Sequence, residues 1–171
     1  MNVHDVGSLL SKALEILDEI QREYPKGEFD REMLHGEMDF RYRRIHELRR
    51  LLDSLPKEVR RFATFVHALP YEKADVVRVM RLLLENPDVF RGASAKEPQA
   101  LKAVAEEAAR KIAGRPSEVV QMITRLRLGG ILTATCEISE PYRLVVAAYL
   151  SEAETAEDSP LDDEGASHEL A

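Results

Sequence analysis

Residues 116–150, PSEVVQMITRLRLGGILTATCEISEPYRLVVAAYL, constrain the fold of this chain more than any other stretch. Pro116 suits the first turn of a helix, because its missing N–H would have no partner there. Apolar residues then recur at helical spacing, so one side of the helix faces a core. The pair Gly129-Gly130 follows, and glycine readily takes the left-handed conformation that ends a helix. We therefore expect a helix over residues 116–128.

Beyond the glycines, the sequence favours strands. Residues 131–138 and 142–150 are rich in β-branched and aromatic residues, and Ser139-Glu140-Pro141 between them is a turn signal. The two segments predict a β-hairpin. Cys136, the single cysteine, is then a small buried apolar group in the first strand.

The outward side of the 116–128 helix carries polar and cationic side chains. Side chains of these types can meet base edges and phosphates in the major groove of DNA. An ordinary amphipathic helix with a solvated face would show the same pattern. A rotation of about 100° per residue places Ser117, Gln121, Thr124 and Leu128 opposite the apolar side, with Arg125 and Arg127 on its flanks.

Further helices are predicted before this one. Apolar residues at helical spacing, interrupted by proline and glycine, indicate where each helix begins and ends. The helix at 73–85 is apolar on most sides and is expected to be central. The predicted ranges are 5–24, 29–55, 57–69, 73–85 and 98–113.

The first two of these helices carry narrow apolar seams, from Val6 to Tyr24 and from Leu34 to Leu55, whose residues step by four and three alternately. Arg41 interrupts the second seam. A short connection makes the pair an antiparallel helical hairpin, and a seam left exposed would suit a homodimer. Packing of both seams within one monomer is the alternative.

Three helices, a glycine-containing turn before the third and a β-hairpin follow the order of winged helix-turn-helix domains. Residues 73–150 resemble that superfamily, most clearly in SEVVQMITRLRLGGIL, which looks like the recognition helix and following strand of bacterial and archaeal winged-helix regulators. The resemblance implies double-stranded DNA as a partner. Winged helices also serve as protein-docking modules, so a protein partner is the alternative.

Residues 39–62 form the most basic segment, with a net charge of +4 and arginines interleaved with Phe40 and Tyr42. Such a surface could bind phosphates and stack on bases, as RNA-binding proteins do. A helix surface laced with i,i+4 ion pairs is the other interpretation. The cations of this second basic patch are Arg43, Arg44, Arg50, Arg60 and Arg61.

The formal net charge of −7 is unevenly distributed along the chain. Residues 151–171 hold eight acidic residues and no lysine or arginine, and the rest of the chain has 24 basic against 23 acidic residues. The nearly neutral body is compatible with a nucleic-acid partner. The acidic segment is poor in apolar residues, which predicts a disordered tail.

No catalytic or metal-binding pattern is complete in the sequence. His46-Glu47 begins like a zinc-protease helix, but Arg50 stands where the second histidine is required. Glu32 and His35 have the Glu-x-x-His spacing of a di-iron bundle without a second copy. No phosphate-binding glycine loop or nucleophile elbow is present. We therefore expect a non-enzymatic protein that uses no metal or cofactor.

The whole sequence predicts a mainly α protein, with a helical hairpin at 1–56, a winged-helix domain at 57–150 and a disordered acidic tail at 151–171. No apolar run is long enough to span a bilayer and no signal peptide is evident, so we expect a cytoplasmic protein without a membrane partner. The leading hypothesis is a DNA-binding transcriptional regulator or DNA-organising factor; a protein-assembly subunit and an RNA-binding protein are the alternatives. The residues expected to contact DNA are Ser117, Gln121, Thr124, Arg125, Arg127, Arg115, Lys111 and Arg143.

Overall fold

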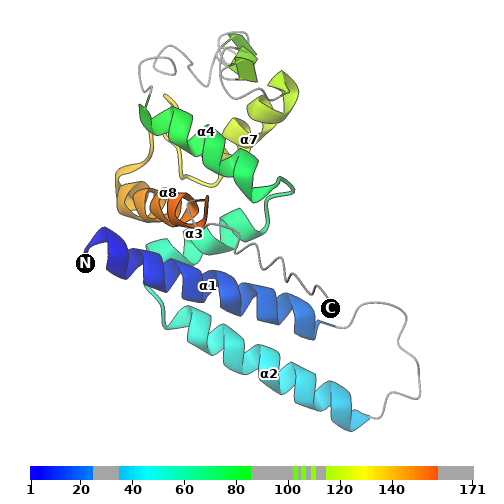
Figure 1. Ribbon diagram of the computed structural model, residues 1–171. Coiled ribbons are helices and arrows are strands. Elements are labelled where there is room, and N and C mark those ends of the chain that lie inside the picture. Colours follow the sequence, from blue (N-terminus) through cyan, green and yellow to red (C-terminus); the bar gives the residue numbers. More distant parts are fainter. Residues whose placement is uncertain (25–34, 86–101, 104, 107–108, 111–114, 158–171) are drawn as a thin grey trace, which may run out of the picture.

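Helices dominate the computed structural model in Figure 1, which describes residues 1–24, 35–85, 102–103, 105–106, 109–110 and 115–157. The mainly α class is therefore confirmed. Most of the helix predicted at 98–113 lies outside the described residues. The described elements are α1 (Val3–Glu23), α2 (His35–Asp53), α3 (Lys57–His67), α4 (Lys73–Glu85), α7 (Pro116–Leu128), the 3-10 helix η1 (Glu140–Tyr142) and α8 (Arg143–Glu157).

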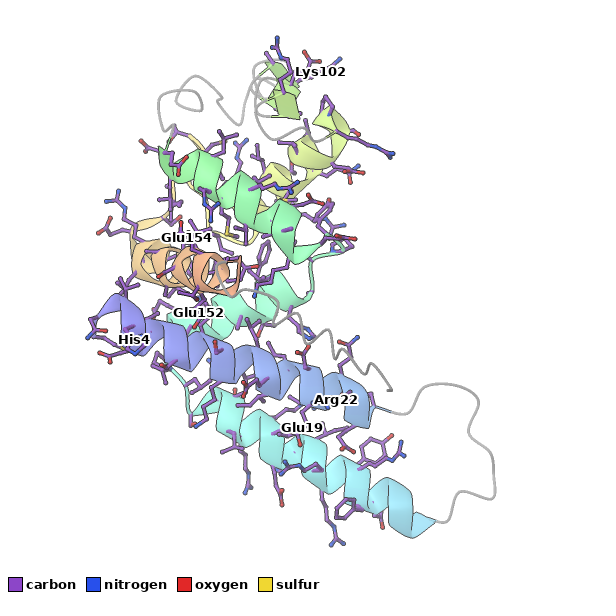
Figure 2. All side chains as sticks on the ribbon, viewed as in Figure 1. His4, Glu19, Arg22, Lys102, Glu152 and Glu154 are labelled. Atoms are coloured by element: carbon purple, nitrogen blue, oxygen red, sulfur yellow. The ribbon has the colours of Figure 1, made fainter. Side chains whose placement is uncertain are left out.

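The pair α1 and α2 lies antiparallel at one end of the molecule, α4 and α7 lie at the other end, and α3 and α8 lie between them (Figure 1). A capping box begins α1: the side chain of Asn2 accepts a hydrogen bond from the Asp5 N–H, and the Asp5 carboxylate accepts one from the Asn2 N–H. On the side of α1 that meets α2, Glu19 (labelled in Figure 2) accepts hydrogen bonds of 2.6 and 3.0 Å from Arg44.

The apolar seams of α1 and α2 are buried along only part of their described length: Leu17 and Ile20 are partly buried, and Tyr24 is 41% exposed. Leu10 and Ala13 of α1 and Leu48 of α2 are at most 1% exposed and belong to one hydrophobic core. The reason is that α1 packs against α2, α3 and α8 together, which covers more than one of its sides. Leu10, Ala13 and Leu48 therefore pack inside one monomer and are not available to a homodimer.

The predicted strand at 142–150 is wrong, because Arg143–Glu157 form helix α8. The β-branched and aromatic character of this segment favours a strand, but its spacing favours a helix. Most of the buried residues recur every three or four positions and so lie on one side of a helix. These are Tyr142, Val145, Val146, Tyr149, Leu150 and Ala153, and the small Ala148 is buried as well.

The predicted disordered tail begins too early at Ser151, because α8 continues to Glu157. Packing against α1 and α4 stabilises this extension. Glu152, labelled in Figure 2, accepts a hydrogen bond of 2.9 Å from the Ser11 hydroxyl of α1. Glu154 lies 3.4 Å from the guanidinium of Arg81 on α4. Residues 158–171 of the predicted tail lie outside the described residues.

The predicted β-hairpin is replaced by a much smaller one at residues 131–139. Its arms meet at a single antiparallel bridge between Leu132 and Ile138, and this bridge is the only β pairing in the described part of the chain. The Thr133 N–H donates to the Glu137 carbonyl at 2.8 Å, so the turn lies at residues 134–136 and not at Ser139–Pro141 as predicted. Cys136 adopts a φ of +62°, which lets the chain reverse before the predicted strand could extend.

The hydrophobic core runs without interruption from α1 to α8. Near its centre, the rings of Phe62 and Tyr149 meet edge to face, with centroids 5.5 Å apart. Ile123 and Leu126 join the inner side of α7 to the same core. None of the helices in the described ranges is both long enough and apolar enough to cross a membrane.

Candidate nucleic-acid interface

Helix α7 has the bounds that the sequence predicts, Pro116–Leu128, and two glycines set its end. Gly130 has a φ of +74°, the left-handed conformation that L side chains rarely adopt. A side chain at position 129 would have no room, because its Cβ would lie 2.5 Å from the ring of Phe65. The end of α7 therefore lies close to the Phe65 ring of α3.

The two sides of α7 differ as predicted. Val119, Met122, Ile123 and Leu126 are buried, whereas Ser117, Gln121, Thr124, Arg125 and Leu128 are exposed. The outward side is therefore accessible to a partner. Leu128 is 84% exposed at the helix end, so this side combines polar, cationic and apolar groups.

Two polar residues on the outward side of α7 already make hydrogen bonds. The Tyr71 hydroxyl donates to the side-chain oxygen of Gln121 at 3.2 Å, which orients the Gln121 amide. The Thr124 hydroxyl donates to the Val120 carbonyl at 2.8 Å. Tyr71 was not anticipated from the sequence, because it lies 50 positions before Gln121 and only the fold brings them together.

The side chain of Arg127, unlike that of Arg125, makes a hydrogen bond to the protein's own backbone in the described part of the chain. It is only partly exposed, and its guanidinium donates a hydrogen bond of 3.0 Å to the Ala134 carbonyl at the turn of the small hairpin. This bond braces the hairpin against the end of α7. Arg125 is exposed and is therefore the more available cation on this helix.

The remaining predicted DNA contacts are partly neutralised by acidic neighbours. Arg115 is exposed, and its guanidinium lies 3.8 Å from the Glu118 carboxylate. Arg143 makes a shorter contact of 2.9 Å with Glu140. Exposed ion pairs of this kind are weak, so phosphates can compete for both arginines. Lys111 lies outside the described residues.

The structure divides the second basic patch into paired and exposed cations. Arg44 bonds to Glu19, which together with Glu47 raises the pKa of its guanidinium. Arg60 lies 2.8 Å from Asp53. Arg43, Arg50 and Arg61 are exposed. Arg44 pairs with Glu19 of another helix and with Glu47 three positions on, and Arg60 pairs with a residue seven positions before it, so a surface laced with i,i+4 ion pairs is not confirmed among the described residues of this patch.

Arg43 and Arg50 share one surface hollow on α2, which has a volume of about 540 Å³. Asp39 and Glu47 also line it, so the charges of the two arginines are balanced by those of two acidic residues. This balance makes the hollow a weaker attractor of polyanions than the arginine content of the helix indicates.

Comparisons with protein-family models, with curated proteins and with solved structures find no match to this chain. Within the described ranges, no group of three or more His, Cys, Asp and Glu side chains is placed to hold a metal ion.

Proposed function

We propose that this protein binds double-stranded DNA by placing the outward side of α7 in the major groove, in the manner of a winged helix-turn-helix regulator or DNA-organising factor. The observation that carries the proposal is the exposure of Gln121, Thr124 and Arg125 on a helix whose opposite side is buried. An amide and a guanidinium can each make two hydrogen bonds to a purine edge.

The surroundings of α7 support the same proposal. Gly129 lies close to the Phe65 ring at one end of the helix, and the Tyr71 hydroxyl donates a hydrogen bond to Gln121 on its outward side. The small hairpin at 131–139 follows the recognition helix in chain order, as a short wing would, and the bond from Arg127 holds it in place.

Phosphate contacts in this proposal come from Arg115, Arg125 and Arg143. Each neutralised phosphate releases counterions, so the logarithm of the binding constant falls with the logarithm of the salt concentration. We expect a slope of roughly −2 to −3 for random duplex DNA, measured by fluorescence anisotropy over a series of salt concentrations. An absence of binding at low salt would contradict the proposal.

A protein-assembly subunit is the second candidate, favoured by the apolar side chains that remain exposed. Phe40 and Leu51 of α2 and Leu128 of α7 are 70%, 46% and 84% exposed. Single exposed apolar residues are common on monomers, so they argue less strongly than the polar side of α7. Analytical ultracentrifugation distinguishes this candidate: self-association without DNA binding would favour it over the first, and would make α2 the natural homodimer surface.

RNA binding through Arg43, Arg50 and Tyr42 is the third candidate. These residues line the hollow on α2, where a base could stack on the exposed tyrosine ring. The two carboxylates in the same hollow oppose a polyanion. A higher affinity for single-stranded RNA than for duplex DNA, lost on removing Arg43 and Arg50, would favour it.

A further inference from the structure

A second hollow, of about 560 Å³, opens beside α3. Its lining comes from the end of α2, from α3, from the residue after α7 and from η1. Arg61 and Thr64 are exposed there, whereas Leu52 and Tyr142 are buried. The hollow is thus cationic toward solvent and apolar at depth, and its volume lies within the range of about 300–1,000 Å³ typical of small-molecule sites.

The charges in this hollow favour an anion. Arg60 and Arg61 both line it, and the single carboxylate among the lining residues is Asp53. Asp53 holds Arg60 at 2.8 Å, whereas Arg61 makes no ion pair within the described part of the chain. The Arg61 guanidinium therefore has no carboxylate partner among the described residues. A guanidinium presents parallel N–H groups that match the two oxygens of a carboxylate or phosphate.

The apolar lining of the hollow favours a ligand that contains a flat apolar ring. Phe65 and Tyr142 contribute aromatic faces, and Leu52 and Ala68 contribute aliphatic surface. The ring of Phe65 is held against Gly129, where a Cβ would come within 2.5 Å of it.

We propose that this hollow binds a small anion that carries a carboxylate or phosphate group on a flat apolar ring. Arg61 pairs with the anionic group, Arg60 adds a second oriented guanidinium, and the ring packs against Phe65 and Tyr142. The site uses none of the outward residues of α7, so it stands independently of DNA binding. A ligand here would touch Gly129, which directly follows α7.

The test is a titration of the full chain, labelled with ¹⁵N, followed by backbone amide chemical shifts. The probes are benzoate, phenyl phosphate and the neutral benzyl alcohol. We expect saturable shifts at Thr64, Phe65 and Gly129 with the anions and a much weaker response to benzyl alcohol. If benzoate binds more tightly than phenyl phosphate, the site prefers a carboxylate; the opposite order shows that it prefers a phosphate. An equal response to benzyl alcohol, or no saturable shift there with either anion, would overturn the proposal.

Variants of the exposed Arg61 make this test specific. Arg61→Gln is expected to weaken anion binding roughly tenfold, as the loss of a charge-assisted hydrogen bond predicts. Arg61→Lys retains the charge and is expected to lose less. Arg43→Gln, on the exposed surface of α2, is the matched control and leaves the affinity unchanged. Unaltered binding by a folded Arg61→Gln protein would show that Arg61 does not hold the anion.

Discussion

Replacing Tyr149 with alanine is expected to lower the free energy of unfolding by about 3–5 kcal/mol, the usual cost of removing a large core aromatic side chain. Tyr149 is 1% exposed, and its ring meets Phe62 edge to face and lies 5.8 Å from the Lys73 ammonium. The alanine variant leaves a cavity where α8 meets α3 and α4. Urea unfolding followed by circular dichroism measures this loss, and a loss below about 1 kcal/mol would show that α8 is not packed as described.

The matched variant Tyr149→Phe keeps the ring and removes the hydroxyl, so it shows how much each contributes to stability. The Tyr149 hydroxyl oxygen is buried and has no hydrogen-bond partner among the described residues. An unsatisfied buried hydroxyl costs free energy, so phenylalanine is expected to leave stability unchanged or to raise it by about 1 kcal/mol. A clear loss of stability in this variant would reveal a partner for the hydroxyl.

Ionisation of the same hydroxyl gives a pH signature. Burial raises the pKa of Tyr149 from 10.0 to about 12. The pKa is higher in the folded protein, so the unfolded protein loses this proton first. Ionisation therefore leaves the stability unchanged below pH 10 and lowers the free energy of unfolding as the pH rises from 10 toward 12. The wild-type protein is therefore expected to lose more stability than Tyr149→Phe over this interval.

Arg125→Ala is expected to weaken the binding of duplex DNA by about 1–3 kcal/mol, roughly a 5- to 150-fold loss of affinity, without lowering the melting temperature. The side chain of Arg125 is exposed, so its removal leaves the core intact. Fluorescence anisotropy gives the affinity and calorimetry gives the melting temperature. An unchanged affinity in the folded variant would exclude Arg125 from the interface.

Two further variants provide controls for this prediction. Arg127→Ala also removes a cation from α7, but it breaks the hydrogen bond to the Ala134 carbonyl, so it should lower stability as well as affinity. Arg43→Ala removes an exposed cation from α2 and is expected to leave DNA affinity unchanged. An equal loss of affinity in Arg43→Ala and Arg125→Ala would indicate a nonspecific effect of net charge.

Local signals in the sequence were sufficient to predict α4 and α7. Pro116 and Gly129-Gly130 mark the ends of α7, and the spacing of its apolar residues identifies the buried side. These signals depend on neighbours within a few residues, so they can be read without the fold. The exposure of Gln121 and Arg125 follows from the same spacing.

The strand predicted at residues 142–150 is wrong because the composition of the segment favours a strand, whereas the spacing of its apolar residues favours a helix. Val145, Val146 and Tyr149 have side chains that favour strands, but their separations are those of one side of a helix. The contacts that involve α8 could not be predicted at all. Ser11 and Glu152 lie 141 positions apart, and their hydrogen bond depends on how α1 and α8 pack.

DNA binding by α7 is tested most directly by mapping the backbone amide chemical shifts of the ¹⁵N-labelled protein as duplex DNA is added at low salt. The largest changes are predicted within residues 117–128, around Gln121 and Arg125, and they should weaken as salt is added. Changes confined to α2 near Arg43 and Arg50, or no change at any residue, would contradict the account.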